Sequence, residues 1–175
     1  MEHIVLNNGI NCPVVGIGTF MLSPKDAENS VREALKMGHR LIDTANAYVN
    51  ERAVGRGMRD SGVKREEIFL STKLWPSEYE NEHAVDETLE RLGVDYVDLL
   101  YIHQPAGNWL AGYRQLEKAY REGKAKAIGI STLKANTWPS WKPSGRSCPS
   151  SSRWRRIRIT RRASCGRRWT STASG

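Results

Sequence analysis

Apolar and polar residues alternate with two different periods along positions 1–132. Short runs rich in Val, Ile and Leu predict buried strands, and the stretches between them repeat apolar residues about every three to four positions, which predicts amphipathic helices. The predicted strands cover residues 3–6, 12–15, 14–18, 40–44, 68–74, 97–102 and 125–131. The predicted helices cover residues 23–38, 51–59, 82–92 and 113–121.

Turn and capping residues mark the borders of these segments. The Asn-Asn-Gly sequence at residues 7–9 predicts a hairpin between the first two strands. Ser23 followed by Pro24 predicts the start of the first helix, and Gly38 and Gly93 predict the ends of the first and third helices. The residues that we expect on buried helix faces are Ala27, Val31, Ala34, Leu35, Val85, Thr88, Leu89, Leu92, Leu116, Ala119 and Tyr120.

The alternation of strands and helices predicts βαβ units and a parallel sheet. Such units form either an open doubly wound sheet or a barrel, and both folds place functional residues at the carboxyl ends of the strands. An open sheet that binds a dinucleotide usually has G-x-G-x-x-G after its first strand, but here Gly16 and Gly18 are followed by Met21 at the third glycine position. We therefore favour an α/β barrel.

Four polar residues follow apolar runs at predicted strand ends. Asp43 ends the second strand of the repeat, Lys73 ends the third and His103 ends the fourth, while Tyr48 lies in the loop after Asp43. Each residue alone has a structural interpretation, such as a helix cap or a packed loop side chain. In a barrel, however, all four converge on one face.

Together these four side chains predict an acid that protonates a carbonyl oxygen. The ammonium of Lys73 is expected to lower the pKa of Tyr48, which is ordinarily near 10. Asp43 would compensate the charge of Lys73, and His103 would orient the carbonyl. Because none of these side chains supplies a hydride, the chemistry predicts a nicotinamide cofactor.

Four segments of the chain carry a resemblance to a known family. They are GHRLIDTA at 38–45 with Glu51, Val54 and Gly55 after it, STKLW at 71–75, DYVDLLYIH at 95–103, and AIGIS at 127–131. These segments resemble the aldo-keto reductase family over residues 1–132, and most nearly its bacterial branch of 2,5-diketo-gluconate and glyoxal reductases. The resemblance implies a (β/α)8 TIM barrel, of which this chain has the N-terminal five βα units and a β-hairpin before them.

The resemblance also implies NADPH-dependent reduction of aldehydes and ketones to alcohols, with NADH as the alternative cofactor. It assigns general acid catalysis to Tyr48, helped by Lys73 and Asp43. The substrate is oriented by His103. The residues implied to contact the cofactor are Thr19, Phe20, Asp43 and Ser131. The residues implied to line the substrate pocket are Phe20, Trp75 and His103, and no metal is implied.

The chain departs from the family pattern at several positions. Gln104 stands where many members carry Trp, and Val49 stands where Gly is common, so we expect an altered pocket shape. Ser131 is followed by Thr132 and Leu133 in place of Asn-Phe, and the last three βα units are missing. Because those units hold the nucleotide phosphates in this fold, we expect the truncated or frameshifted chain to be inactive by itself.

Residues 133–175 differ in composition from residues 1–132. They hold nine arginines, two lysines and no acidic residue, a formal charge of +11, whereas residues 1–132 carry −3 and the whole chain carries +8. Three interpretations remain open: an out-of-frame reading of a gene that encodes more barrel, a disordered tail without a role, and a basic arm that binds nucleic acid or anionic lipid. We favour the first. A non-catalytic barrel fragment with a nucleic-acid-binding tail is the alternative function.

Other signals narrow the class of protein. No apolar run approaches the roughly 20 residues of a bilayer span, and the N-terminus lacks the pattern of a signal peptide, so we expect a cytoplasmic protein with a small carbonyl substrate and no membrane partner. Cys12, Cys148 and Cys165 show no metal-ligand spacing. An aldolase-like Schiff base on Lys73 is a further alternative. The oligomeric state is not predicted.

Overall fold

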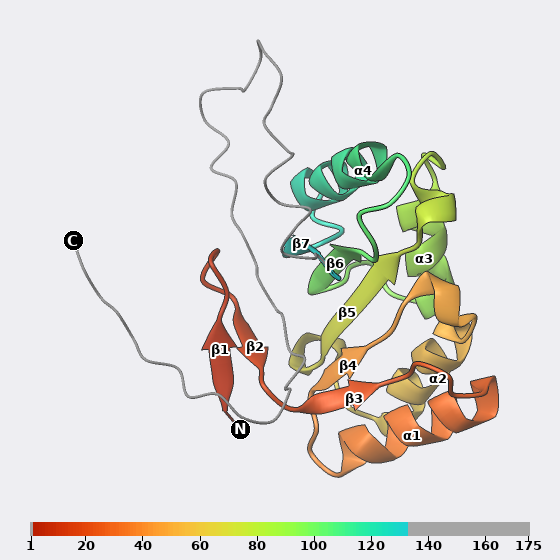
Figure 1. Ribbon diagram of the computed structural model, residues 1–175. Helices are drawn as coiled ribbons and strands as arrows, with labels where there is room; N and C mark the ends of the chain where they lie inside the picture. The colour runs from red at the N-terminus through yellow and green to blue at the C-terminus, as the bar shows by residue number, and fades with distance from the viewer. Residues whose placement is uncertain (1, 133–175) are drawn as a thin grey trace, which may run out of the picture.

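A computed structural model of the chain describes residues 2–132. A small antiparallel hairpin precedes a parallel sheet of five strands, and four α-helices cover the outer face of that sheet (Figure 1). The segment 133–175, on which the three interpretations of the basic tail depend, lies outside the described residues. None of the helices formed by the described residues is long and apolar enough to cross a bilayer.

The parallel strands follow one another in chain order. They are β3 (Gly16–Gly18), β4 (Leu41–Asp43), β5 (Phe69–Leu74), β6 (Leu99–Ile102) and β7 (Ile128–Ile130). Each strand pairs with the next in parallel, in the order β3-β4-β5-β6-β7. An open doubly wound sheet would reverse its strand order at a switch point, so this unreversed order is that of a barrel wall.

The helices begin and end at residues that satisfy their free backbone groups. They are α1 (Pro24–Lys36), α2 (Glu51–Ser61), α3 (Ala84–Leu92) and α4 (Trp109–Arg121). Ser23 caps α1 by accepting a hydrogen bond from the amide of Asp26, as its position before Pro24 predicts. Gly93 caps α3 in the left-handed region, with φ at 66°, and confirms the predicted end of that helix.

The sheet has an apolar layer on each face. Outward-facing residues of the strands, such as Ile42, Leu70 and Leu100, pack against the helices in the main core. On the inner face, the hairpin of β1 (His3–Val5) and β2 (Asn11–Pro13) brings a second cluster over the amino-terminal parts of the strands. That second cluster consists of Leu6, Cys12, Phe69, Leu99, Tyr101 and Ala127, with Ile10 and Leu41 packed against it.

The main differences from the sequence-based predictions concern β3 and α4. The strand predicted at 14–18 is shorter, and Val15 before it is 56% exposed, because β3 has a neighbouring strand on one side only among the described residues. Helix α4 begins at Trp109, four residues before the predicted start at Tyr113. Tyr120, predicted to face inward, is 47% exposed, because Ala119 takes the buried position beside it.

Candidate active site

The four residues proposed for catalysis lie together at the carboxyl ends of three neighbouring strands. Asp43 is the last residue of β4, Lys73 is the penultimate residue of β5, and His103 directly follows β6. Tyr48 ends η1 (Asn46–Tyr48), a short 3-10 helix after β4. Alternate residues of a strand point to the same face, so Phe69 and Lys73 share the inner face of β5, where Phe69 belongs to the hairpin cluster.

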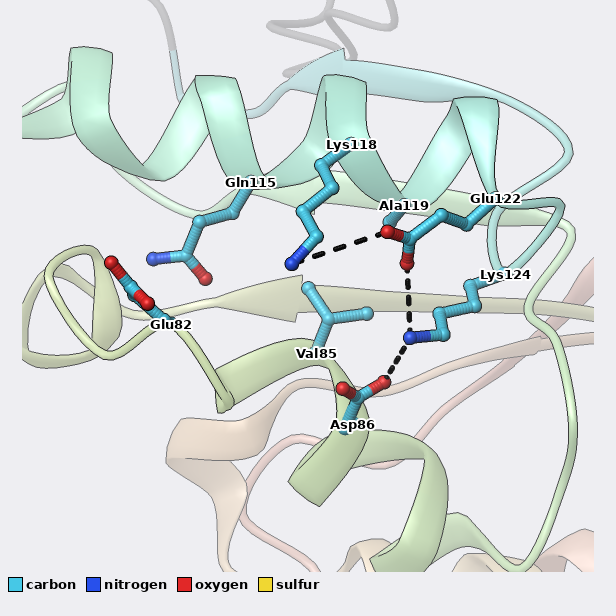
Figure 2. Close-up of a pocket in the computed structure, with 8 residues that line it drawn as sticks. All are labelled: Glu82, Val85, Asp86, Gln115, Lys118, Ala119, Glu122 and Lys124. Atoms are coloured by element: carbon cyan, nitrogen blue, oxygen red, sulfur yellow. Dashed lines mark ion pairs between the residues drawn. The ribbon is translucent and has the colours of Figure 1, made fainter.

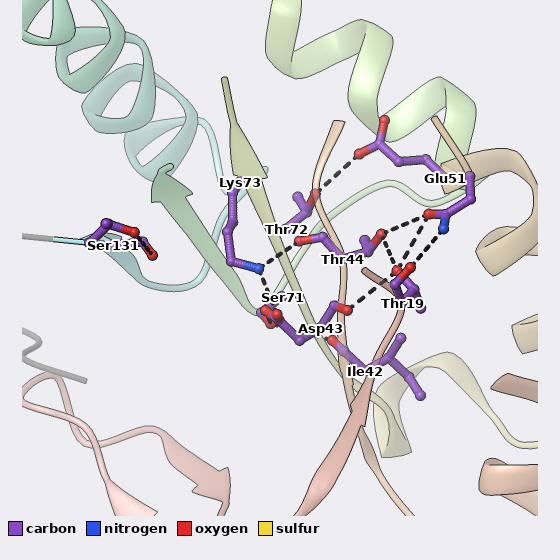
Figure 3. Close-up of polar contacts among 11 residues, drawn as sticks. Thr19, Ile42, Asp43, Thr44, Glu51, Ser71, Thr72, Lys73 and Ser131 are labelled. Carbon is purple, nitrogen blue, oxygen red and sulfur yellow. Dashed lines mark hydrogen bonds and ion pairs between the residues drawn. The ribbon is translucent and has the colours of Figure 1, made fainter. Parts of the chain in front are cut away.

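An ion pair forms the centre of the site. The Nζ of Lys73 donates to Oδ2 of Asp43 at 2.6 Å and to the backbone oxygen of Thr44 at 3.0 Å (Figure 3). The hydroxyl of Ser71 donates to the other carboxylate oxygen of Asp43, also at 2.6 Å. The Lys73 side chain is 10% exposed. A desolvated ammonium therefore has its carboxylate partner fixed by a second hydrogen bond.

Aromatic rings surround the ion pair. The Nζ of Lys73 lies 5.4 Å from the ring centroid of Tyr48, and that ring meets His103 edge-on with 5.8 Å between centroids. Trp75 meets His103 edge-on from another direction, at 4.8 Å. Phe20 is tilted against Tyr48 at 5.1 Å and is 65% exposed. The arrangement places a phenol and an imidazole side by side, with the exposed ring of Phe20 against the phenol.

The pKa of Tyr48 differs from the sequence-based expectation. Burial of the phenol raises this pKa above 10, and the nearby carboxylate of Asp43 raises it further. Lys73 was expected to lower it, but the positive charge of Lys73 is already compensated by Asp43 at 2.6 Å. The phenol is thereby kept protonated in the free protein.

His103 is held neutral. Burial lowers its pKa to about 4, and the positive charge of Lys73 acts in the same direction, against a smaller opposite effect of Asp43. Its Nδ1 is buried and has no hydrogen-bond partner among the residues that the structure describes. An unpartnered N–H costs more than an unpartnered lone pair on a ring nitrogen, so we place the single proton on Nε2.

The residues predicted to contact the cofactor do not all lie beside the candidate catalytic residues. Thr19 is fully buried, and its hydroxyl hydrogen-bonds that of Thr44 at 2.8 Å, so it has no surface to offer a ligand. Ser131 follows β7, and its amide donates to the backbone oxygen of Ile102 at 2.8 Å. In Figure 3 the side chain of Ser131 stands apart from the contacts around Lys73.

Several residues that shape the site were not singled out from the sequence. Ser71 had a usable signal, because it lies two positions before Lys73 and so shares its face of β5. Asn50 had no such signal in the sequence. Its side chain donates to the backbone oxygens of Thr19 at 2.9 Å and of Leu22 at 3.1 Å, which lie 31 and 28 residues before it in the chain. Such long-range contacts appear only when the strands are assembled.

A pocket on the outer surface lies away from these residues. It is situated between α3 and α4, and ion pairs cross it from Lys124 to Asp86 at 2.6 Å and to Glu122 at 3.0 Å (Figure 2). Its lining residues are Glu82, Val85, Asp86, Gln115, Lys118, Ala119, Glu122 and Lys124. The charged groups there largely pair with one another, and none of the candidate catalytic residues reaches the pocket.

The sequence profile of the Aldo/keto reductase family matches residues 14–141. Among curated relatives, glyoxal reductase from Bacillus subtilis is 42% identical over 140 residues, which cover 77% of this chain and 51% of the relative. Morphine 6-dehydrogenase from Pseudomonas putida is 44% identical over 133 residues, which cover 73% of this chain and 45% of the relative. The chain thus spans about half the length of these curated relatives.

Solved structures agree with the sequence comparison. An aldo/keto reductase from Brucella melitensis superposes with a TM-score of 0.73 at 42% identity, covering 76% of this chain and 53% of that one. The Bombyx mori aldo-keto reductase in complex with NADP superposes with a TM-score of 0.72 at 32% identity, covering 77% of this chain and 52% of that one. These proteins are (β/α)8 barrels, so the five parallel strands are part of such a barrel, as the sequence predicted. The chain belongs to the aldo/keto reductase family.

Proposed function

We propose that residues 1–132 carry the catalytic part of an NADPH-dependent carbonyl reductase in which Tyr48 is the general acid. The observation that carries this proposal is the gathering of a phenol, an imidazole and a lysine–aspartate pair at the strand ends. A relative named glycerol 2-dehydrogenase (NADP(+)) from Saccharomyces cerevisiae, 38% identical, supports the choice of cofactor. A glyoxal reductase among the relatives supports reactive aldehydes as substrates.

The residues at the strand ends fit the nicotinamide end of such a cofactor. The hydroxyl of Ser131 contacts that of Thr132 at 3.2 Å and can both donate to and accept from a carboxamide. Asp43 offers a carboxylate whose side chain is 38% exposed. A bound reduced nicotinamide would supply the hydride, which the side chains of this site cannot supply.

The chain's own residues would orient the carbonyl and protonate it. Nε2 of His103 donates a hydrogen bond to the carbonyl oxygen, because the ring is neutral and its other nitrogen is buried. The hydroxyl of Tyr48 donates its proton to the same oxygen as negative charge develops there. The phenolate formed in this step regains a proton from solvent, because the raised pKa of Tyr48 favours the protonated phenol.

The lysine contacts favour this role over an aldolase-like one. A Schiff base requires a free lone pair on the amine. In the structure Lys73 donates to a carboxylate and to a carbonyl oxygen, and both contacts suit an ammonium. We therefore keep Lys73 as a positioning residue for Tyr48.

We also propose that the 175-residue chain does not turn over by itself. The described residues form five parallel strands, whereas the family fold has eight. In barrels of this kind the loops after strands seven and eight hold phosphate groups. Activity is therefore expected only when the remaining units are supplied.

A chimera tests the proposed reaction. Residues 1–131 of this chain are joined to the carboxyl-terminal half of the Bacillus subtilis glyoxal reductase, which is 42% identical in the matched region. We expect the chimera to oxidise NADPH in the presence of methylglyoxal. Tyr48→Phe should lower kcat by about 100-fold or more, the usual effect of removing a general acid.

Tyr120→Phe in the same chimera is the matched control. It removes the same hydroxyl from an exposed position on α4 and should leave the rate unchanged. A folded chimera that does not oxidise NADPH would contradict the proposed reaction. An active chimera that is unaffected by Tyr48→Phe would contradict the role of Tyr48.

A further inference from the structure

The orientation of His103 has an unusual origin. An imidazole that acts in catalysis is commonly held by a hydrogen bond to its second ring nitrogen. Here Nδ1 of His103 is buried without a partner among the described residues, and the imidazole meets the rings of Tyr48 and Trp75 at interplanar angles of 78° and 83°. The ring is therefore held by packing and by the backbone that carries it.

The amide of His103 itself donates to the backbone oxygen of Leu74 at 2.9 Å, and Tyr79 holds the backbone that follows it. The hydroxyl of Tyr79 donates to the backbone oxygen of Gln104 at 2.7 Å and accepts from the amide of the same residue at 3.3 Å. Gln104 directly follows His103, and its carbonyl also accepts the amide of Ala106 at 2.8 Å. A single phenol thus contacts the peptide groups on both sides of the Gln104 Cα, the first of which is shared with His103.

Tyr79 is itself held by α4. Its side chain is 1% exposed, and Nε2 of Gln115 donates to its backbone oxygen at 2.7 Å. A Cβ at Gly112 would lie 2.4 Å from Cδ1 of Tyr79, so the Tyr79 ring packs directly against the backbone of α4 at this glycine. The chain of contacts runs from α4 through Tyr79 to the turn after β6.

We propose that Tyr79 is a positioning residue for His103: its hydroxyl clamps the Gln104 peptide and so fixes the imidazole that orients the substrate carbonyl. The role in orientation rests on the proposed function. The clamp is a property of the folded chain and does not depend on turnover. Removing the hydroxyl leaves the amide and the carbonyl of Gln104 without this partner, so the turn that follows the anchored amide of His103 is held less firmly.

Several charged or titratable groups face His103, and their effects on its pKa are expected to be the same in the parent protein and in variants of Tyr79. Lys73 lowers its pKa and Asp43 raises it, while the Tyr48 ring contacts it directly. None of these groups is altered by a change at Tyr79. A loosened turn changes mainly how much water reaches the imidazole, and water stabilises its charged form.

The test is a titration of His103 by NMR in the 175-residue chain. The protein is labelled with 15N-histidine, and His103→Asn assigns the signal among the four histidines of the sequence. In the parent chain we expect His103 to titrate near 4, in the tautomer with its proton on Nε2. In Tyr79→Phe the midpoint should rise by about one pH unit toward the ordinary value near 6.5, because the looser turn admits water.

Two further variants keep the test decisive. Tyr120→Phe makes the same chemical change on the exposed side of α4 and should leave the His103 titration unchanged. Gln115→Met retains the Tyr79 ring and hydroxyl but removes the donor to its backbone oxygen, so it should shift the midpoint in the same direction by less. It serves as the reporter if Tyr79→Phe does not fold.

The outcomes separate this inference from the proposed function. A parent-like His103 titration in folded Tyr79→Phe, or in folded Gln115→Met where Tyr79→Phe does not fold, overturns the clamp whatever the activity of the chimera. A shifted titration supports the clamp. In the active chimera, Tyr79→Phe should then lower kcat by about 10-fold with a smaller change in KM, because the histidine is misplaced during the chemical step.

Discussion

Val49 is a strained residue beside the proposed acid. It follows Tyr48, has a φ of 58°, and its side chain is 85% exposed. A β-branched residue in the left-handed region is a genuine outlier, and such strain often lies at functional sites. The exposed side chain makes no packing contribution that would compensate for the strain.

Val49→Gly should stabilise the protein. Glycine adopts this backbone conformation without the clash of a Cβ, a gain of about 1–2 kcal/mol, and part of that gain is lost to the greater freedom of glycine in the unfolded chain. We expect the free energy of unfolding in urea to rise by about 1 kcal/mol. Val15→Gly is the control, because Val15 is also exposed but does not have a positive φ. Equal changes in the free energy of unfolding for the two variants would show that the backbone conformation of Val49 does not destabilise the protein.

The gathering of the four candidate residues was predictable from strand ends, but their ionisation was not. Asp43, Tyr48, Lys73 and His103 each follow an apolar run, and parallel strands bring such positions together. The expected lowering of the Tyr48 pKa was wrong, because it depends on how completely Asp43 compensates Lys73. A distance of 2.6 Å between those side chains cannot be read from sequence spacing.

At the scale of elements, two glycines of α2 set how closely the helices pack. A Cβ at Gly55 would lie 2.2 Å from the backbone oxygen of Leu92 in α3. A Cβ at Gly57 would lie 2.6 Å from the backbone oxygen of Glu28 in α1. The obstacle is backbone in both cases, so neither neighbour can rotate away.

Gly55→Ala should therefore destabilise the fold. The added methyl group forces α2 and α3 apart, at a cost of about 1–3 kcal/mol, and the better helix propensity of alanine offsets up to about 1 kcal/mol of it. We expect a net loss of about 1–2 kcal/mol in the free energy of unfolding. Gly18→Ala is the matched control, because a Cβ there meets nothing within 4 Å. A Gly55→Ala protein as stable as the parent would refute this close approach of the helices.

The approximate positions of the helices and strands were predictable from the sequence. The side of a helix on which some residues lie was not. Ala27 and Val31 repeat at helical spacing and are buried in α1 as expected. Tyr120 was placed inward from the same kind of pattern but is exposed, since an aromatic residue at the edge of an apolar stripe fits either side. The start of α4 was missed because Trp109 and Leu110 lie before the stripe that defined the helix.

At the scale of the whole molecule, the strand order places every proposed catalytic residue at one end of the sheet. The hairpin packs Leu6 and Cys12 toward the opposite end, where Phe69 and Leu99 begin their strands. This division between a proposed catalytic end and a stabilising end is typical of barrels. The repeated strand–helix pattern sufficed to predict it, whereas the contacts that hold the turn after His103 required the assembled structure.

The most direct test of the account is the pH dependence of kcat/KM for methylglyoxal reduction by the chimera. This parameter reports the ionisations of the free enzyme. Tyr48 must be protonated to act as an acid, and its raised pKa keeps it so as the pH rises; His103 must be neutral, and it is neutral above about 4. We predict a rate that is level from about pH 5 and declines only above about pH 10. A decline centred near pH 7 or 8 would contradict the account, because it would mean that Lys73 lowers the pKa of Tyr48 despite its pairing with Asp43.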